Sequence, residues 1–136
     1  MDKEIIFKPI GHIESEFQDR EEIPKQSVLT KDKVAKIILN EELLDGIYGL
    51  KEGDDIMILF YFHQSEDFKL KFNHHSGEVR GVFNTRSPNR PNGIGISIVN
   101  IKKINRNLIY FSGVDMVSGT PVLDIKPYIP ELNTSN

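Results

Sequence analysis

Residues 80–97 read Arg-Gly-Val-Phe-Asn-Thr-Arg-Ser-Pro-Asn-Arg-Pro-Asn-Gly-Ile-Gly-Ile-Ser and lie between two apolar, strand-like runs. A buried strand does not tolerate this density of proline, glycine and charge, so we expect a loop here. Its two prolines stiffen the backbone and hold Ser87 and Arg90 in extended conformations. Arg86 and Arg90 then stand on a rigid frame, as planar groups suited to carboxylate, phosphate or a base edge. The composition alone also fits an ordinary hairpin loop with solvated arginines.

Strand-like runs make up most of the chain. They are short, β-branched or aromatic, and separated by turn residues, which predicts a mainly all-β fold, a β-barrel or sandwich. Only residues 40–50 look helical, with Asn40 as the N-cap. The segment Asn105-Arg106-Asn107 predicts a tight hairpin in which the asparagines take positive φ. The expected strands are residues 4–13, 34–39, 56–62, 79–83, 94–104, 108–114 and 121–125.

Length and composition place the chain among small globular proteins. Its 136 residues are enough for one domain with a real core. The longest apolar run, residues 56–62, is too short to span a bilayer, and the first residues do not resemble a signal peptide, so we expect a cytoplasmic protein. The absence of cysteine excludes disulfides and thiolate ligands or nucleophiles. His74 and His75 would point to opposite faces of a strand, so we predict no metal site.

Charge is unevenly distributed along the sequence. The formal net charge is −3, yet residues 69–106 contain only one acidic residue, Glu78. The cations of this segment are Lys69, Lys71, Arg80, Arg86, Arg90, Lys102, Lys103 and Arg106. A basic middle on an acidic chain indicates a local contact with a polyanion. Alternatively, the charges neutralise one another in the fold, because a linear segment need not form one surface patch.

Two long polar stretches, residues 14–33 and 63–78, interrupt the strand pattern. Loops of this length inside a compact domain are usually functional or disordered. The second begins with His63 and Gln64, directly after an apolar run. At that point a rigid strand can present polar side chains to the rim of a site.

Two long motifs identify a resemblance to the TsaA-like (TrmO) family. The first is residues 80–97, and the second, residues 112–130, reads Ser-Gly-Val-Asp-Met-Val-Ser-Gly-Thr-Pro-Val-Leu-Asp-Ile-Lys-Pro-Tyr-Ile-Pro. Residues 23–29 and 62–64 also resemble family segments in the expected order, so the resemblance covers residues 7–132. The characterised members are S-adenosylmethionine-dependent tRNA methyltransferases, which methylate N6 of the threonylcarbamoyladenosine next to the anticodon.

The resemblance implies a single small β-barrel domain over residues 1–136, S-adenosyl-L-methionine as cofactor and tRNA as substrate. It further implies a homodimer with the cofactor near the subunit interface. The implied cofactor-binding residues are Ser27, Val28, Leu29, His63, Gln64, Arg86, Ile98, Val114, Asp115, Met116 and Val117. Of the other polar residues in the two motifs, we assign Arg90 and Asn92 to substrate binding or to fixing the loop. Asp124, Lys126 and Tyr128 are the catalytic candidates.

The chain departs from the family pattern at three points. It ends shortly after Tyr128, where larger bacterial relatives have a further C-terminal domain, so we expect a short form. Ser118 stands where relatives usually have aspartate. Gly93 stands where they often have a second proline, which predicts a looser cofactor loop.

Methyl transfer from a sulfonium is an in-line displacement, so positioning matters more than proton handling. Arg86 is suited to the methionyl carboxylate of the cofactor. The N6 atom lies in a urea-like group and must lose a proton, for which Asp124 is a candidate base. Asp124 can instead accept loop amides or pair with Lys126, which lies on the same strand face. Lys126 suits a phosphate or a carboxylate, and Tyr128 suits base stacking or plain packing.

Two other function classes stay open from the sequence. One is a methyltransferase that acts on a small molecule or another nucleoside. The other is a module without enzymatic activity that binds S-adenosylmethionine or RNA. Fold-level resemblance alone does not separate these classes.

Overall fold

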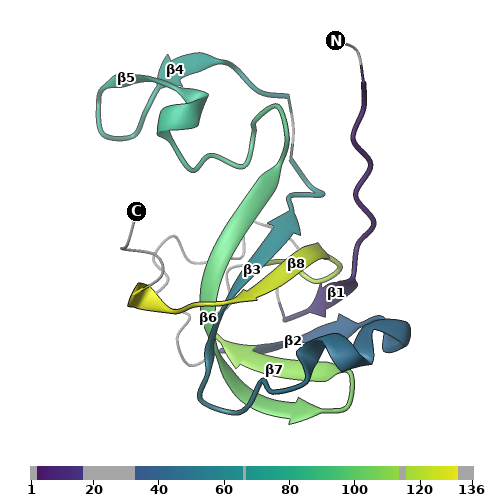
Figure 1. Ribbon diagram of the computed structural model, residues 1–136. Coiled ribbons are helices and arrows are strands. Elements are labelled where there is room, and N and C mark those ends of the chain that lie inside the picture. Colours follow the sequence, from purple (N-terminus) through teal and green to yellow (C-terminus); the bar gives the residue numbers. More distant parts are fainter. Residues whose placement is uncertain (1–2, 17–32, 66, 114–115, 132–136) are drawn as a thin grey trace.

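Six antiparallel strands form the body of the protein in a computed structural model that describes residues 3–16, 33–65, 67–113 and 116–131 (Figure 1). They pair in the order β1-β2-β7-β6-β3-β8, and the pairing of β8 with β1 closes the barrel. The strands are β1 (Gly11–Glu14), β2 (Val34–Leu39), β3 (Asp55–Tyr61), β6 (Ile94–Asn105), β7 (Leu108–Ser112) and β8 (Pro121–Pro127). The predicted mainly all-β barrel is confirmed.

Side chains from alternate positions of the strands fill the interior of this barrel. Successive side chains of a strand point to opposite faces, so every second residue points inward. The inward set is almost entirely β-branched, aliphatic or aromatic, and small barrels of this kind have a packed core rather than a channel. Functional groups must therefore lie on the rim and outer wall. The buried core comprises Ile13, Ala35, Ile37, Ile56, Ile58, Phe60, Val99, Ile101, Ile109, Phe111, Met116, Val117 and Val122.

The predicted helix is present as η3 (Glu41–Ile47), a 3₁₀ helix. Asn40 precedes it in an extended conformation but makes no side-chain cap. Its amide Nδ2 donates instead to the carbonyl of Pro9 at 3.2 Å, so the predicted capping role is wrong. Among the described residues, no helix has both the length and the apolar character needed to cross a bilayer.

The start of one strand and the conformation of one turn differ from the sequence prediction. The strand expected from residue 4 begins only at Gly11, because Pro9 has no N–H for a ladder. In the β6–β7 turn the residue with positive φ is Arg106 (55°), rather than either asparagine. Asn107 instead uses its amide to donate to the carbonyl of Leu39 at 2.9 Å.

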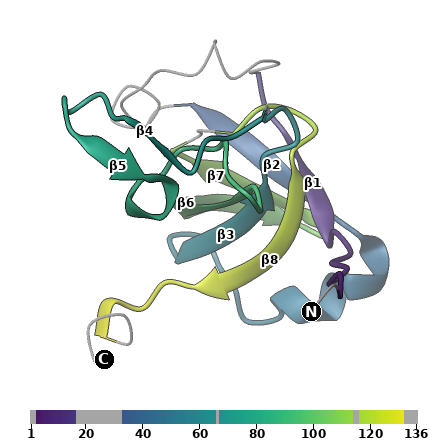
Figure 2. The same ribbon diagram turned by 90° about the horizontal axis from the view of Figure 1, so that it is seen from above.

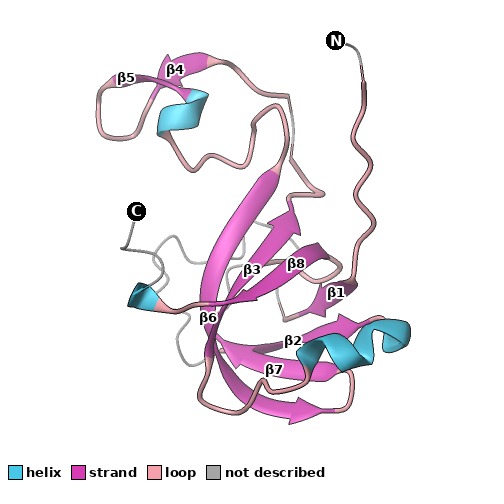
Figure 3. Cartoon of the chain, viewed as in Figure 1, coloured by secondary structure: helices cyan, strands magenta, loops and turns pink. Residues whose placement is uncertain are grey.

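A small hairpin stands apart from the barrel. Strand β4 (Lys71–Asn73) pairs with β5 (Val79–Gly81) as a separate two-stranded sheet. Figure 2 shows this hairpin outside the ring of barrel strands. The expected strand 79–83 is thus shorter, because η4 (Val82–Asn84) follows β5 directly. The polar residues around 71–73 had predicted a loop, so β4 was missed. Figure 3 shows the hairpin and η4 leading into the loop before β6.

Gly95 is required by the packing of two phenyl rings at the start of β6. A Cβ at this position would lie 2.6 Å from Phe60 Cζ and 2.7 Å from Phe62 Cζ. These rings already pack edge to face, with centroids 5.1 Å apart. We expect Gly95→Ala to lower the free energy of unfolding by about 1–3 kcal/mol, the usual cost of overpacking a core.

Urea denaturation measures this effect, and Gly46→Ala is the matched control. Gly46 lies in η3, and a Cβ added there would meet no atom within 4 Å. The control should therefore leave the stability unchanged or slightly raised. Equal effects of the two substitutions would contradict the packing role of Gly95.

Candidate functional site

The arginine loop, defined here as residues 85–93, connects η4 to β6 at one end of the barrel (Figure 1). Its own short polar side chains hold its backbone. Thr85 Oγ1 donates to the carbonyl of Val82 at 2.8 Å and accepts from the Ser87 N–H at 3.3 Å. The Asn89 N–H in turn donates to Ser87 Oγ at 3.2 Å. The rigid frame predicted from the prolines is therefore strengthened by a chain of side-chain hydrogen bonds.

Arg90 stabilises the arginine loop by hydrogen bonds to carbonyls of the same loop. Its Nη1 donates to the carbonyls of Thr85 at 3.0 Å and Ser87 at 3.1 Å, and the residue is half-buried. One guanidinium thus ties together two carbonyls that would otherwise lack partners in the loop. Of the two roles that the sequence left open for Arg90, fixing the loop is the one these bonds perform.

Arg86 differs from Arg90 in that it is exposed and makes no hydrogen bond or ion pair with any described residue. It lines a pocket of about 500 Å³. The other lining residues are Phe60, Phe62, Thr85, Arg90, Asn92, Ile94, Gly95 and Ile96. An available guanidinium above an aromatic and aliphatic floor suits an anionic group carried on a partly apolar ligand.

The end of β3 is fastened to the arginine loop. The Phe62 N–H donates to the carbonyl of Gly93 at 2.7 Å, and Ser65 Oγ donates to the carbonyl of Pro88 at 2.9 Å. His63 and Gln64 form the turn between these two contacts. These two residues thus lie beside the arginine loop, and their role in binding stays a prediction.

His63 also reaches the second family motif. A Cβ added to Gly119 would lie 3.7 Å from His63 Nε2, so the imidazole lies beside the glycine backbone. Three segments far apart in sequence, residues 62–65, 85–93 and 116–120, therefore meet at one end of the barrel. This convergence defines the candidate site.

Two predicted cofactor contacts in the second motif, Met116 and Val117, have buried side chains. Met116 and Val117 are 2% and 4% exposed and belong to the barrel core. Thr120 Oγ1 donates to the carbonyl of Val117 at 2.7 Å and fixes the turn. Any contact of Met116 or Val117 with a ligand has to come from their main-chain atoms. Ser118, at the unusual position of the motif, accepts the Ser15 N–H at 3.3 Å.

Asp124 and Lys126 lie on the outer wall of the barrel. Lys126 Nζ lies 3.0 Å from Asp124 Oδ2, and the Ile125 N–H donates to Asp124 Oδ1 at 2.9 Å. The ion pair that the sequence offered as an alternative role is thus present. Both side chains are about half exposed, which makes such a pair worth little in stability.

The strand register relates Asp124 to the pocket. Leu59 of β3 is paired with Asp124 on one side and with Ile96 on the other. Neighbouring strands lie about 4.8 Å apart, so Asp124 sits roughly 10 Å from Ile96, which lines the pocket. Ile98 and Lys126 flank Met57 in the same way. The predicted cofactor contact Ile98 and the catalytic candidates Asp124 and Lys126 therefore lie on the same outer face of the barrel.

Tyr128 follows Lys126 by two residues, but within one chain it lies far from the arginine loop. Its N–H donates to the carbonyl of Asp55 at 3.0 Å, at the beginning of β3, whereas the arginine loop contacts the end of that strand. The seven residues of β3 separate these positions by about 20 Å.

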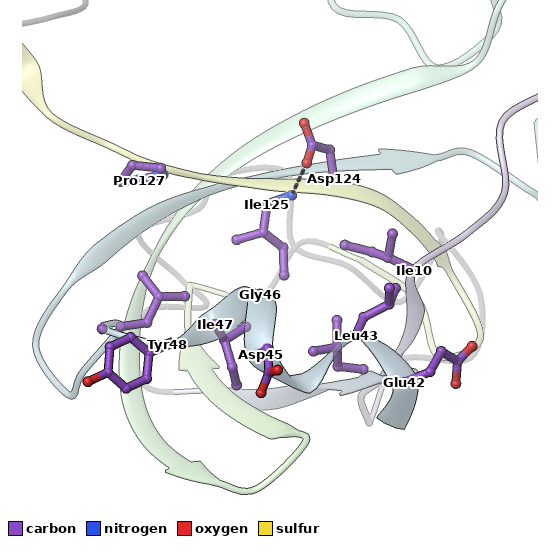
Figure 4. A pocket seen from close by; sticks show the side chains of 13 residues that line it. Ile10, Glu42, Leu43, Asp45, Gly46, Ile47, Tyr48, Asp124, Ile125 and Pro127 are labelled. Atoms are coloured by element: carbon purple, nitrogen blue, oxygen red, sulfur yellow. Dashed lines mark hydrogen bonds between the residues drawn. The ribbon is translucent and has the colours of Figure 1, made fainter.

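Two further pockets border these elements. One, of about 680 Å³, lies between η3 and β8, and Figure 4 shows Ile125 pointing toward η3 while the Asp124 side chain projects away from it. The other, of about 940 Å³, lies between residues 3–9 and the Arg90–Ile94 segment. Sequence patterns gave no signal for either pocket, because each is formed by residues from separate parts of the chain.

Five predicted cofactor contacts lie outside the described residues: Ser27, Val28, Leu29, Val114 and Asp115. Among the residues that are described, no three His, Asp or Glu side chains are grouped as a metal would require. His74 and His75 do not point to opposite faces as predicted. Their ring centroids are 3.9 Å apart, because both residues lie in the β4–β5 turn rather than on a strand.

Comparison with known proteins gives the same architecture. The crystal structure of TrmO from Pseudomonas aeruginosa matches with a TM-score of 0.81 and 34% identity over 97% of this chain, and 59% of that chain is covered. An S-adenosyl-L-methionine-binding protein of Archaeoglobus fulgidus is 36% identical, over 97% of this chain and 95% of that protein.

A tRNA (adenine(37)-N6)-methyltransferase of Mus musculus is 36% identical over 96% of this chain. The match covers 32% of the mouse protein, so the chain spans about a third of the length of this relative. The family described as "tRNA-methyltransferase O N-terminal domain" matches residues 12–134. The chain thus belongs to the tRNA-methyltransferase O N-terminal domain family.

Proposed function

We propose that the protein is an S-adenosylmethionine-dependent methyltransferase, and that its acceptor is N6 of threonylcarbamoyladenosine in tRNA near the anticodon. The observation that carries the proposal is the exposed guanidinium of Arg86, which has no partner among the described residues and stands over the aromatic floor of a pocket. The first family motif lines this pocket, and the second approaches the neighbouring turn through the contact of Gly119 with His63. Relatives bear the names of a cofactor-binding protein and of a tRNA methyltransferase.

The pocket residues fit S-adenosylmethionine in size and chemistry. A volume of about 500 Å³ lies within the usual range for small-molecule sites. Arg86 would bind the methionyl carboxylate, since planar guanidinium groups pair with carboxylates in two parallel hydrogen bonds. The aromatic rings of Phe60 and Phe62, which line the pocket, suit the apolar surroundings of the cationic sulfonium. When bound, the cofactor supplies an activated methyl group.

The acceptor requires loss of one proton as the methyl group is transferred. Asp124 is our candidate for that proton, because its carboxylate lies on the outer wall two strands from Ile96 of the pocket. Lys126, 3.0 Å from Asp124, would hold the carboxylate in place and offer its ammonium to the substrate carboxylate. Water reaches both side chains, so the substrate itself must exclude it for the proton transfer to be efficient.

A homodimer would complete this site. Ile94, Ile96 and Ile98 alternate along the outer face of β6 and form an exposed isoleucine stripe. Exposed apolar surface of this kind usually marks a contact with another protein. The stripe begins at the pocket, since Ile94 and Ile96 line it. A second copy packed on the stripe would therefore close the pocket.

Methyl transfer to tRNA tests the proposal. Purified protein is incubated with S-adenosylmethionine carrying a labelled methyl group, together with tRNA that carries or lacks threonylcarbamoyladenosine. We expect label in the modified tRNA only. Label in neither tRNA, from protein that binds the cofactor, would show that the protein acts on another substrate or only binds the cofactor. Label in both would place the methyl group on another nucleoside.

A further inference from the structure

The cations of residues 69–106 form two separate groups rather than one patch. Lys69 and Lys71 belong to the β4–β5 hairpin region, beside the arginine loop. Lys102 and Lys103 lie at the far end of β6, next to Arg106 in the turn. Strand β6 has 12 residues, so about 36 Å separate its two ends. Figure 1 shows the hairpin at the top of the molecule and the β6–β7 turn at the bottom.

The two faces of the hairpin differ in exposure. Directly opposed residues of an antiparallel pair share a face. Phe72 and Arg80 oppose each other and are both half-buried, which marks the face toward the protein. Lys71, opposite Gly81, lies on the other face, which is exposed. The ammonium of Lys71 is therefore presented to solvent.

The positive charge of this exposed face comes from Lys69 and Lys71. Neither forms an ion pair with a described residue, whereas Arg80 Nε lies 3.3 Å from Glu78 Oε2. His74 adds little charge at neutral pH, because desolvation, then the nearby His75 and Arg80, lower its pKa below the usual value. Two lysines on a projecting hairpin, neither with an ion-pair partner in the described part of the chain, are an electrostatic contact point for an anion.

An exposed aromatic residue lies in η4, between β5 of the hairpin and the pocket-lining Thr85 along the chain. Phe83, in η4, is 77% exposed. The Val82 N–H donates to the carbonyl of Leu70 at 2.8 Å, so the chain before β4 and the chain after β5 stay together at the base of the hairpin. Phe83, the residue after Val82, therefore lies at the same end of the hairpin as Lys69, the residue before Leu70. Two residues later, Thr85 begins the lining of the pocket.

We propose that this hairpin, residues 68–84, holds the RNA substrate beside the arginine-loop pocket. Lys69 and Lys71 contact phosphates, and Phe83 stacks on an unpaired base next to the one that receives the methyl group beside the pocket. Lysines that neutralise phosphates position a nucleic acid, and aromatic side chains bind the bases of single-stranded loops. Phosphate-binding lysines and an exposed aromatic ring, together beside a pocket, favour a structured RNA with an exposed loop over a simple polyanion. This inference rests on the proposed function only in requiring RNA as the acceptor.

The salt dependence of tRNA binding tests the lysines. Fluorescence anisotropy with a labelled tRNA carrying threonylcarbamoyladenosine is measured from about 50 to 200 mM salt, the range in which phosphate contacts change affinity strongly. The variant Lys69→Gln/Lys71→Gln is compared with Lys102→Gln/Lys103→Gln, which removes the same charge at the other end of β6. We expect the slope of log affinity against log salt to become shallower by about 1.5–2 in the first variant. The slope should not change in the second.

Phe83→Ala tests the stacking contact in the same assay. We expect its affinity to fall by about five- to a hundredfold at every salt concentration, with an unchanged slope, because stacking is not a counterion effect. Cofactor affinity of all three variants should equal that of the wild type, which shows that the pocket is intact.

The outcomes separate this inference from the proposed function. Equal slopes for the two lysine variants, or a wild-type affinity in Phe83→Ala, with normal tRNA binding by the wild type, would overturn the role of the hairpin. A wild-type protein that binds S-adenosylmethionine but no tRNA would overturn the proposed function as well.

Discussion

Substitution of Arg86 by glutamine is expected to lower the affinity for S-adenosylmethionine by about ten- to a hundredfold, without a change in fold stability. Hydrogen bonds to charged groups contribute about 1.5–3 kcal/mol, and Arg86 offers the pocket a guanidinium with no described partner to compete for it. Because its side chain is exposed, its removal leaves no buried group unsatisfied. Calorimetric titration with the cofactor at constant salt measures the affinity, and thermal unfolding of the free protein measures the stability.

Arg106→Gln is the matched control for charge. It removes one arginine at the β6–β7 turn, far from the pocket, and should leave cofactor affinity unchanged. Arg86→Lys should fall between the wild type and Arg86→Gln, since an ammonium keeps the charge but loses the paired geometry. Wild-type affinity in Arg86→Gln would place the cofactor away from the arginine loop.

Ile98→Glu is expected to convert a dimer into a monomer, with a dissociation constant raised about a thousandfold. In a twofold dimer the substitution occurs twice, and each buried, unpaired carboxylate costs at least about 2 kcal/mol. Ile98 is the preferred position because, unlike Ile94 and Ile96, it does not line the pocket that contains Arg86. Sedimentation equilibrium without cofactor measures the association directly.

Val34→Glu provides a control of equal exposure. Val34 and Ile98 are each 52% exposed, but Val34 lies at the beginning of β2, two strands from Asn100 of β6 and outside the isoleucine stripe. The control should sediment as the wild type does. A wild type that is already monomeric, or an Ile98→Glu variant with unchanged association, would argue against the stripe as the subunit interface.

The barrel was predictable from the sequence because its strands carry a strong local signal. Residues 34–39 and 94–104 are rich in β-branched apolar residues, and the structure has β2 and β6 at these positions with nearly the same bounds. The hairpin strand β4 was missed, since Lys71 and Asn73 are polar on an exposed face and only Phe72 is apolar. The Asn40 cap is absent in the structure, where the side chain is oriented by the bond from its Nδ2 to the carbonyl of Pro9, thirty-one residues away in sequence.

The site was predictable only in part. The density of arginine, proline and asparagine in residues 85–93 correctly indicates a rigid loop, and its own side-chain bonds confirm the frame. Only the family resemblance separated the roles of Arg86 and Arg90. Residue type and spacing did not, because whether a guanidinium bonds to loop carbonyls depends on the folded backbone. The aromatic floor had no signal either, as Phe60 and Phe62 read simply as core residues of a strand.

A crystal structure of the protein with S-adenosylmethionine tests the central claim most directly. We predict the methionyl carboxylate within hydrogen-bonding distance of the Arg86 guanidinium, with the cofactor in the pocket floored by Phe60 and Phe62. Cofactor bound instead between η3 and β8, or between residues 3–9 and the Arg90–Ile94 segment, with Arg86 facing solvent, would contradict it.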